Sequence, residues 1–495
     1  MFPSPAKNYR RLAALFALAL CASLSAPAGA EEKAAEAKPQ KEQPLFDRLL
    51  ELNLKQEPDV KEADLRGWFK EVVAKAQEAL SKSKTPKEKC AALSQLLLSN
   101  REVKMISGDY GKQATLAAAL QPKREVNCLG MSILFALVGE ALKQPIYLVA
   151  VPAHYFARWD DGQVRINIET TDRLGKSIPD DIYLYQKAQL LPDDVFMLGW
   201  GRPLDQHGLL AEFLEAVMLH KMAEGAPLDE ITPLMDEVEK LVPYRSDWHF
   251  DHMLVKANTE GKRLDIRKEI AALMEKGSLP PSVFASAAMW LASEAASTRD
   301  YEMQRRMLLT ALPMVPKGCE FSVLQDLAFC LRNKKDYHAA ASYMELAASL
   351  TPTNTPAFAD IFYSLAILQK NDNRTDEALE TVRAALKTKP DNYALKLAEA
   401  GLLAASGKTE EGQKAFEKIG NPPGEPEAYN LITAWYYAVS KQKDKFFPQF
   451  EKALAQTGSL NALAELEEDP DLAPFRDDPK FKELMDKQRQ RLRGQ

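Results

Sequence analysis

The stretch HYFARWDDGQVRINIE, residues 154–169, decides the fold of the front part of this chain. It holds two runs with alternating apolar residues, and Asp161-Gly162 between such runs is a strong signal for a β-hairpin. With these two residues at the centre of a two-residue turn, one face of the hairpin is apolar. Three facing pairs form it: Trp159 with Val164, Ala157 with Ile166, and Tyr155 with Ile168. We therefore expect this face to be buried against a core.

The same register predicts a polar pair on the opposite face of the hairpin. His154 stands opposite Glu169 there, and the Cβ atoms of directly opposite residues lie about 4.5–5.5 Å apart. A carboxylate beside an imidazole orients the ring and stabilises its protonated form. The register also sets Arg158 opposite Arg165, a like-charge pair that we expect to fan into water near the turn.

Cys128 is the candidate nucleophile that this pair lacks. It opens an apolar-periodic stretch that runs to Leu142, and Asn127 before it is a good N-cap residue. The positive end of a helix dipole favours the thiolate form of a cysteine. After Pro145, the β-branched run at 146–151 predicts a buried strand. A cysteine at a helix start, followed by a histidine and an acid on strands, is an arrangement for nucleophilic catalysis.

Three short motifs resemble the transglutaminase-like superfamily: NCLGMS at 127–132, PAHYF at 152–156 and NIETT at 167–171. The resemblance is strongest to the bacterial branch in which such a core precedes tetratricopeptide repeats, and it covers about residues 85–220. It implies a papain-like fold. It also implies roles for three residues, with Cys128 as nucleophile, His154 as base and Glu169 as the orienting acid.

The chain departs from this family at two positions. Most members have aspartate where Glu169 stands, and Phe156 replaces the usual tryptophan two residues after the histidine. Asp172 is a less favoured acid, because it falls beyond the end of the predicted strand. The side chain that completes an oxyanion hole is not assigned, and Tyr110 and Gln113 are unranked candidates. Such folds are also kept as binding modules, so the sequence leaves activity open.

A helical repeat is predicted between 321 and 420. Small residues recur where two helices approach closely, and proline ends the second helix, which resembles the tetratricopeptide repeat with its period of about 34 residues. Ala340 and Ala378 are 38 residues apart, and Ala378 and Gly412 are 34 apart, so we expect a longer connection near Thr353–Pro356. Further helical hairpins, too degenerate to align, are expected at 209–320 and 425–485.

The first 30 residues read as a secretory signal with a positive start, a short apolar stretch and a small-residue cleavage site. These parts are Lys7, Arg10 and Arg11, then Leu12 to Leu24, then Ala28-Gly29-Ala30. We expect cleavage after Ala30 and a periplasmic or secreted mature protein. Alternatives are an uncleaved anchor and a lipoprotein signal at Cys21, which the bulky Leu20 disfavours. Residues 31–44 are charged and poor in large apolar residues, as in a disordered linker.

Composition excludes several classes of protein. The 495 residues are 46% apolar and 27% charged, which is the balance of a globular chain rather than of a disordered or collagen-like one. The formal charge of −6, with no basic run, argues against nucleic-acid binding. After the signal, every apolar run is too short to span a membrane. We assign no cofactor and no metal.

The remaining cysteines and histidines supply little chemistry. Cys90 lies in an apolar helical stretch and is interpreted as core, while Cys319 and Cys330 could pair although their spacing does not demand it. The segment DWHFDH at 247–252 matches no standard spacing of metal ligands, and a polar helix face is the favoured interpretation. Nothing is assigned to His207, His220 and His338.

We therefore predict an α+β papain-like, transglutaminase-like domain followed by an all-α tetratricopeptide-type solenoid. The expected function is exported, cysteine-dependent acyl transfer by an amide hydrolase or transglutaminase-like enzyme, with a peptide or protein partner in the repeat groove. The alternative is a non-catalytic interaction scaffold. The expected parts are signal 1–30, linker 31–44, transglutaminase-like domain 45–207, degenerate helical hairpins 208–320, repeats 321–485 and a charged tail 486–495.

Overall fold

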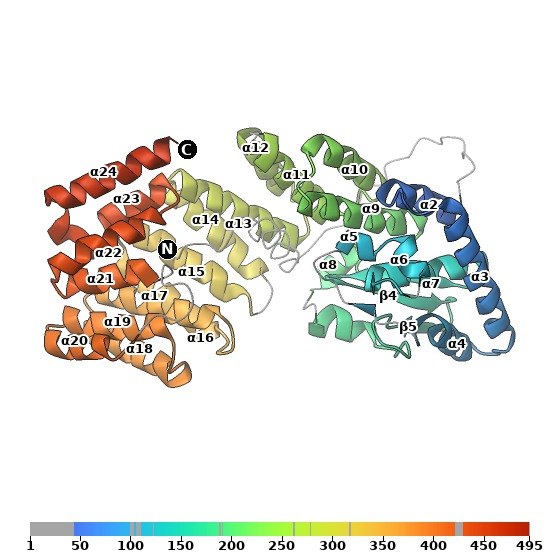
Figure 1. Ribbon diagram of the computed structural model, residues 1–495, viewed down its shortest axis with the longest axis horizontal. Helices are drawn as coiled ribbons and strands as arrows, with labels where there is room; N and C mark the ends of the chain where they lie inside the picture. The colour runs from blue at the N-terminus through green and yellow to red at the C-terminus, as the bar shows by residue number, and fades with distance from the viewer. Residues whose placement is uncertain are drawn as a thin grey trace. The chain divides into compact units, whose positions relative to one another are not determined.

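A computed structural model gives the fold of the chain (Figure 1). The predicted signal peptide and residues 31–43 of the predicted linker lie outside the residues that it describes. The chain divides into two compact units at 287/288 in the sequence. The described residues are 44–99, 103–104, 110–121, 123–187, 190, 192–260, 263–277, 279–315, 318–420 and 429–494.

Helices open the first unit. They are α2 (Leu45–Gln56), α3 (Glu62–Ser81) and α4 (Pro86–Leu98). Helix α4 begins with a capping box, in which the Thr85 hydroxyl accepts the backbone N–H of Glu88 and the Glu88 carboxylate accepts that of Thr85. All three helices contribute side chains that are fully buried in one core: Leu49, Leu65 and Leu93.

A three-stranded antiparallel sheet follows, in the order β3 (Ile146–Val151), β4 (His154–Asp160) and β5 (Arg165–Ile168). The predicted strand at 146–151 is confirmed, and it pairs with β4 through a tight turn at Pro152-Ala153. Residues 201–204 return to the outer edge of β3, where the Gly201 N–H donates to the Ala150 carbonyl at 2.9 Å. The return covers part of the free sheet edge.

The register of the β4–β5 hairpin differs by two residues from the predicted one. Ala157 pairs with Ile168, and Arg158 pairs with Asn167, because the loop comprises four residues, 161–164, rather than two. The Asp161 carboxylate stabilises this loop by accepting the backbone N–H groups of Gln163 and Val164, at 3.0 and 2.7 Å.

The observed register also removes the predicted like-charge pair. Arg165 stands opposite Asp160, and its Nε lies 2.9 Å from the Asp160 carboxylate. Because side chains alternate with a period of two, a shift of two residues leaves every side chain on its predicted face. The facing pairs were therefore predicted wrongly, while the two faces were predicted correctly. Trp159, Ala157 and Ile168 of the apolar face are buried.

Helix α7 (Cys128–Ala141) packs against β3 and β4 and lies at the centre of the first unit (Figure 1). Every residue from Cys128 to Gly139 is buried. A helix that is apolar all round must be enclosed on all sides, and this one is covered by the sheet and by the surrounding helices. Its residues share one core cluster with the apolar face of the hairpin.

The other elements of the first unit surround this core. They are β1 (Val103–Lys104), α5 (Tyr110–Gln113), α6 (Leu116–Leu120), β2 (Val126–Asn127), the π-helical turn η1 (Ile182–Lys187), α8 (Pro192–Met197), α9 (Gln206–Ala223), α10 (Leu228–Leu241), α11 (Ser246–Glu260) and α12 (Arg263–Glu275). The short strands β1 and β2 pair in parallel and lead into α7. Among the described residues, a membrane-spanning helix of sufficient length and apolarity is not found.

The second unit is helical throughout its described residues. The division at 287/288 falls inside α13 (Pro281–Ser297), whose later part opens the second unit. The other elements of this unit are α14 (Tyr301–Ala311), η2 (Leu312–Met314), α15 (Glu320–Asn333), α16 (Tyr337–Leu350), α17 (Ala357–Asn371), α18 (Thr375–Thr388), α19 (Tyr393–Ala405), α20 (Thr409–Glu417), α21 (Asn430–Val439), α22 (Lys443–Ala455), α23 (Leu460–Glu468), η4 (Pro470–Phe475) and α24 (Pro479–Arg493). Helices α15 to α22 form four successive helical hairpins, which confirms the predicted repeat and extends it by one unit.

Small residues sit where the two helices of a hairpin meet. Ala340 and Ala378 are fully buried. At Gly412, an added Cβ would lie 2.7 Å from the Ala400 carbonyl oxygen of the neighbouring helix, so a larger residue does not fit without a shift. The predicted longer connection is present, since residues 351–356 join α16 to α17 whereas 389–392 join α18 to α19.

Three of the expected domain boundaries fall inside helices, one of them at 320/321 after the first residue of α15. The division at 207/208 lies within α9, and that at 485/486 lies within α24, which continues through the expected tail to Arg493. Phe213 and Leu214 of α9 pack into the core around α7, because this helix is apolar enough to be covered there. Residues 208–287 therefore share one compact unit with the sheet.

Candidate active site

Cys128 is the first residue of α7, as the sequence predicts. The side chain of Asn127 caps the helix by accepting the Gly130 N–H at 2.9 Å. Cys128 therefore lies at the positive end of the helix dipole, which favours a negative charge on its sulfur. The residue is 0% exposed, so the site is closed to solvent around the sulfur.

His154 opens β4 and is held by Glu169, directly after β5. Its Nε2 lies 3.1 and 2.9 Å from the two carboxylate oxygens of Glu169. In the observed register the two residues are offset by two positions, so they form a diagonal pair on the same face of the hairpin. Long side chains reach one another across such a diagonal. The predicted contact is thus present, although the predicted facing position is not.

Glu169 receives more hydrogen bonds than the one from histidine. The backbone N–H and the hydroxyl of Thr171 both donate to its Oε1, at 3.0 and 2.6 Å, and the Tyr183 hydroxyl donates to its Oε2. Burial alone would raise the pKa of this carboxyl. The bonds from His154, Thr171 and Tyr183 outweigh burial and lower the pKa of Glu169 to about 2, so the residue is a fixed negative charge.

The second ring nitrogen of His154, Nδ1, is not bonded to Glu169. Nδ1 is buried and has no hydrogen-bond partner of good geometry in the described part of the chain. Burial lowers the pKa of His154, but the nearby Cys128 side chain and the hydrogen-bonded Glu169 carboxylate raise it to about 9. An imidazole with this pKa is protonated at neutral pH.

Tyr183 is a member of this cluster that the motifs did not reveal. It lies in η1, and its ring stacks on Phe156 with centroids 4.4 Å apart and on His154 at 5.6 Å. The tyrosine thus holds both the acid and the imidazole in place. It lies within the Asp-Asp-Ile-Tyr-Leu-Tyr stretch at 180–185, but no spacing rule singled it out. Burial and the Glu169 charge raise the pKa of its hydroxyl, which keeps it a donor.

A buried arginine supports the sheet beside this cluster. Arg158 is 1% exposed and donates to the Asn167 side chain and the Gly201 carbonyl, each at 2.7 Å, and also pairs with Asp180. Asn167 donates to Asp180 in turn, at 2.7 Å. These bonds join β4 and β5 to the segment that carries Tyr183, so they fix the distance between the histidine strand and the tyrosine.

Thr170 links the cysteine helix to the hairpin. Its hydroxyl lies 3.3 Å from the Ser132 hydroxyl and 3.4 Å from the Cys128 carbonyl oxygen. All of these groups are buried. Because Thr170 follows Glu169 directly, the same two residues hold the histidine and the start of α7.

The other residues singled out in the sequence take structural positions. Asp172 accepts the backbone N–H of Leu174 at 2.9 Å and so caps a turn. The side-chain amide of Gln113 donates to Glu125 at 3.2 Å. The backbone carbonyl oxygen of Gln113 packs against Gly130 in the first turn of α7, where an added Cβ would lie 2.8 Å from it. The side chain of Tyr110 lies outside the described residues. The oxyanion donor is thus still unassigned.

The DWHFDH segment lies in α11, and its histidines pair with carboxylates. His252 is 1% exposed and lies between Glu239, 2.9 Å from Nδ1, and Glu215, 3.2 Å from Nε2. Burial lowers the pKa of His252, but both carboxylates raise it to about 9. Among the described residues, groups of three or more side chains suited to hold a metal are not found.

The described cysteines are all free. Cys90, Cys128 and Cys330 are buried and Cys319 is partly exposed, so Cys319 and Cys330 do not form the pair that was considered. Cys90 belongs to the core, as predicted, and burial raises the pKa of its thiol to about 12.

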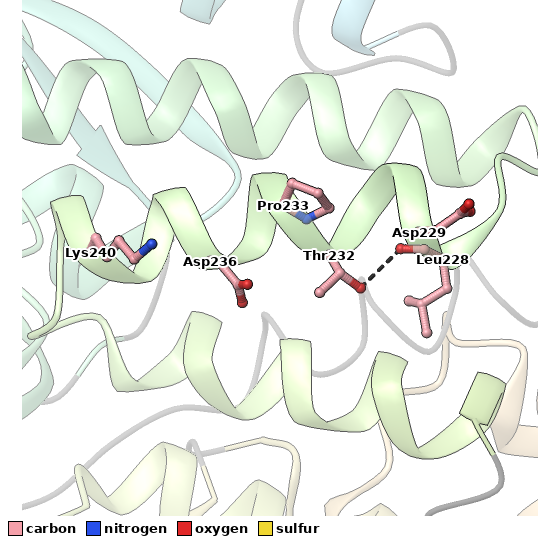
Figure 2. Close-up of a pocket in the computed structure, with 6 residues that line it drawn as sticks. All are labelled: Leu228, Asp229, Thr232, Pro233, Asp236 and Lys240. Carbon is pink, nitrogen blue, oxygen red and sulfur yellow. Dashed lines mark hydrogen bonds between the residues drawn. The ribbon is translucent and has the colours of Figure 1, made fainter.

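Two hollows in the first unit lie away from Cys128. Figure 2 shows the larger one, about 630 Å³, along α10, where Pro233 lies within the helix and the Thr232 hydroxyl donates to the Leu228 carbonyl at 2.9 Å. The other, about 160 Å³, is lined by residues of α11 to α13 and of the loops beside them. No residue of α7, β4 or β5 lines either hollow.

Comparisons with known proteins agree with this architecture. A family model described as the transglutaminase-like superfamily matches residues 64–177, and one described as a tetratricopeptide repeat matches residues 321–354. The chain therefore carries a transglutaminase-like α+β domain, followed by all-α tetratricopeptide-type repeats. The first match includes Cys128, His154 and Glu169. The second coincides with the hairpin of α15 and α16.

Similarity to individual proteins is lower. The STIP1 homolog of Dictyostelium discoideum is 29% identical over 171 residues, which is 34% of this chain, and the chain spans 28% of that relative's length. The solved structure of YrrB, a tetratricopeptide repeat protein with an unusual peptide-binding site, covers 37% of this chain and is covered over 92% of its own, at 18% identity and a TM-score of 0.24. Yeast Tom70 covers 88% of this chain and is covered to 88%, at 14% identity and a TM-score of 0.31.

Proposed function

We propose that this chain is an exported, cysteine-dependent acyl-transfer enzyme whose repeats bind a peptide or protein partner. The observation that carries the proposal is the position of the His154 ring. One ring nitrogen is hydrogen-bonded to the Glu169 carboxylate, the other is buried without a hydrogen bond from the described residues, and the adjacent Thr170 links this hairpin to Cys128. A thiol, an imidazole and an acid in this order form the machinery of thiol nucleophiles.

The chemistry follows from the charges in the cluster. The proposed mechanism starts from a Cys128 thiolate and a His154 imidazolium, and Glu169 stabilises the positive ring. The thiolate attacks the carbonyl carbon of an amide or ester and forms a tetrahedral adduct. The adduct collapses to a thioester while the departing amine or alcohol takes the proton of His154. The ring, now neutral, acts as base for a second nucleophile that attacks the thioester and restores the thiolate.

The second nucleophile decides the class of product. Water gives net hydrolysis, and an amine gives transamidation. Both reactions use the same roles for Cys128, His154 and Glu169. The repeats supply the surface that selects the acyl donor or its carrier protein, since repeat solenoids present extended surfaces to peptides and proteins. We place the mature protein in the periplasm or outside the cell, on the strength of the signal-like first 30 residues.

Alkylation of Cys128 tests the proposal without knowledge of the substrate. The rate of iodoacetamide labelling is measured against pH by mass spectrometry of the Cys128 peptide. A thiolate paired with His154 labels well below pH 7, whereas an ordinary thiol follows ionisation near pH 8.5. Burial slows the reaction at every pH, so the shape of the profile decides. Cys90 is the internal reference, because burial raises the pKa of its thiol to about 12.

The variant His154→Ala is the matched control. It should remove the labelling of Cys128 below pH 7, and leave Cys90 unchanged. A Cys128 profile that follows an ordinary thiol in the unaltered chain, with no response to His154→Ala, would overturn the enzyme proposal.

One observation favours a second candidate, a non-catalytic scaffold. Cys128 is fully buried, and neither described hollow reaches it. A domain that keeps the cluster only for stability would show Cys128 labelling that appears solely on global unfolding. Labelling that requires the denaturant needed to unfold the chain therefore identifies the scaffold.

A further inference from the structure

The repeat unit contains an acidic segment near the end of the chain. Residues 459–475, SLNALAELEEDPDLAPF, hold five acidic residues and neither lysine nor arginine. They comprise α23 and the 3-10 turn η4. Pro470 and Pro474 end the α-helix and keep the second part of the segment as a tight turn.

Basic residues on successive hairpins receive this acidic segment. Arg332 of α15 pairs with Glu465 at 3.0 Å, and Lys370 of α17 pairs with Asp471. Arg299, between α13 and α14, pairs with Glu468 at 3.0 Å. We call Arg299, Arg332 and Lys370 the basic ladder. Its three members come from three successive helical hairpins, so the segment runs across the repeats rather than along one of them.

The ladder follows the period of the repeat. Arg332 and Lys370 are 38 residues apart, the same spacing as Ala340 and Ala378, so they occupy equivalent repeat positions. Each is the next-to-last residue of the first helix of its hairpin. A repeated fold therefore places two cations in register, and the acidic segment meets them with carboxylates six positions apart in sequence.

The indole of Trp435 also binds the Asp471 carboxylate. The Trp435 Nε1 on α21 donates to Asp471 at 2.6 Å, while the other carboxylate oxygen pairs with Lys370. Trp435 lies against Gly401 of α19, where an added Cβ would be 2.2 Å from the ring. The side chains of Lys370 and Asp471 are 13% and 12% exposed, so this pair is far more enclosed than an ordinary surface ion pair.

Apolar contacts, rather than ion pairs, hold the rest of the segment 459–475 in place. Leu463, Leu472 and Phe475 pack into the core of the C-terminal helices, with Phe446 and Phe450. The apolar side chains of the segment thus contact the C-terminal helices, and so does Glu467 through Arg489, whereas Glu465, Glu468 and Asp471 pair with the basic ladder. Tethering through the apolar side chains raises the effective concentration of these three carboxylates at the ladder.

We propose that the basic ladder with Trp435 is a ligand surface of the repeats for acidic peptides, and that the segment 459–475 is its built-in occupant. This inference rests on the repeats being the binding region of the proposed function. An external partner would then be an acidic peptide that copies the spacing of Glu465 and Asp471 and competes with the chain's own segment. The chain's own segment 459–475 therefore covers the basic ladder until such a partner displaces it.

The test uses the full chain and a fluorescein-labelled synthetic peptide of residues 459–475. In the variant Glu465→Gln/Asp471→Asn, the segment loses its ion pairs with Arg332 and Lys370, keeps the pair between Glu468 and Arg299, and keeps its shape. We expect hydrogen exchange of 459–475 at least about tenfold faster than in the unaltered chain. We expect the peptide, followed by fluorescence anisotropy, to bind this variant at least about tenfold more tightly than it binds the unaltered chain.

A second change separates a ligand surface from a structural cap. Adding Lys370→Gln to the variant should weaken peptide binding at least about tenfold. The matched control, Glu451→Gln/Glu483→Gln, removes two exposed ion pairs with Lys487 and Lys480 and should alter neither readout. Faster exchange without peptide binding would overturn the proposal, since the segment would then be a cap alone.

Folding of the variants is checked by circular dichroism. If Glu465→Gln/Asp471→Asn does not fold, Arg332→Gln decides, because its pair with Glu465 is partly exposed and can be broken without isolating a buried charge. Exchange of 459–475 should then rise at least about threefold, and no rise overturns the proposal. These readouts are independent of Cys128 labelling, so failure here leaves the test of the proposed chemistry intact.

Discussion

The two units of the chain hold their charged groups in opposite ways. In the first unit the charged groups of the candidate site are buried beside aromatic rings, and Glu169 is hydrogen-bonded to His154, Thr171 and Tyr183. In the second unit most ion pairs join exposed side chains, whereas the pair between Lys370 and Asp471 is enclosed. Buried charges set the protonation of their neighbours, whereas exposed pairs contribute little and are screened by salt. Chemistry is therefore expected in the first unit and recognition in the second.

The largest expected effect comes from removing the buried acid. In Glu169→Gln the charge beside His154 is lost, so the pKa of the ring falls and the ion pair with Cys128 is no longer favoured. We expect iodoacetamide labelling of Cys128 at pH 6 to fall about 100-fold, with a stability loss of about 3 kcal/mol for the broken buried pair. Asp172→Asn, which alters only a turn, is the control. Unchanged labelling of Glu169→Gln at pH 6 would contradict the assignment.

The second prediction sharpens the comparison through pH. The pKa values of His154 and His252 are raised to about 9, so their stabilising contribution is complete below about pH 6.5 and is lost as pH rises through 9. Each unit of raised pKa corresponds to about 1.4 kcal/mol. The first unit should therefore become easier to unfold between pH 7 and 9.5. The second unit has one histidine, His338, with a side chain 79% exposed, and should not.

Hydrogen exchange resolved by peptide separates the two units in this experiment. Glu169 gives the opposite dependence of stability on pH. Because its pKa is lowered to about 2, its stabilising contribution is present above about pH 4.5 and is lost as pH falls toward 2. Equal changes in both units across the alkaline range would break the comparison.

The third prediction concerns close packing at glycine. In Gly130→Ala the new Cβ would lie 2.8 Å from the Gln113 carbonyl oxygen, so α5 or α7 must shift at the start of the cysteine helix. We expect a loss of about 1–3 kcal/mol in the free energy of unfolding of the first unit, measured by urea titration. Gly67→Ala, with open space around the new Cβ in α3, should instead stabilise by about 0.5–1 kcal/mol.

The smallest effect is expected for the tyrosine that sequence motifs did not reveal. Tyr183→Phe keeps the stacked ring and removes the hydroxyl that donates to Glu169. We expect a loss of about 1 kcal/mol in stability. Cys128 labelling at pH 6 should slow by about threefold, as Glu169 still receives bonds from Thr171. An effect as large as that of Glu169→Gln would mean that Tyr183 does more than position the acid.

Local patterns predicted the helices, the two faces of the hairpin and the order of the site. Asn127 before Cys128 marked the helix start, and alternation along 154–169 placed His154 and Glu169 on one face. Turn length was not predictable in this way, because the Asp161 carboxylate stabilises a four-residue loop through backbone bonds that a dipeptide rule does not count.

Contacts between distant parts of the chain were the second limit. Tyr183 reaches Glu169 only because Arg158 and Asp180 fix the segment beside the sheet, and no periodicity encodes that placement. The apolar side of α9 gave no sign of which core it joins, so the expected boundary at 207/208 falls inside a helix that packs around α7. The contact of residues 459–475 with the basic ladder depends likewise on how the successive helical hairpins pack together.

Along the hairpin at 154–169, side chains alternate between the two faces with a period of two residues. A loop that gains or loses two residues returns the same side chains to the same face, and the diagonal reach of His154 to Glu169 absorbs the difference. A loop that changes by one residue would turn the acid toward the apolar core and separate the pair. We expect insertions and deletions that preserve the site in relatives of this chain to change the length of this loop by even numbers.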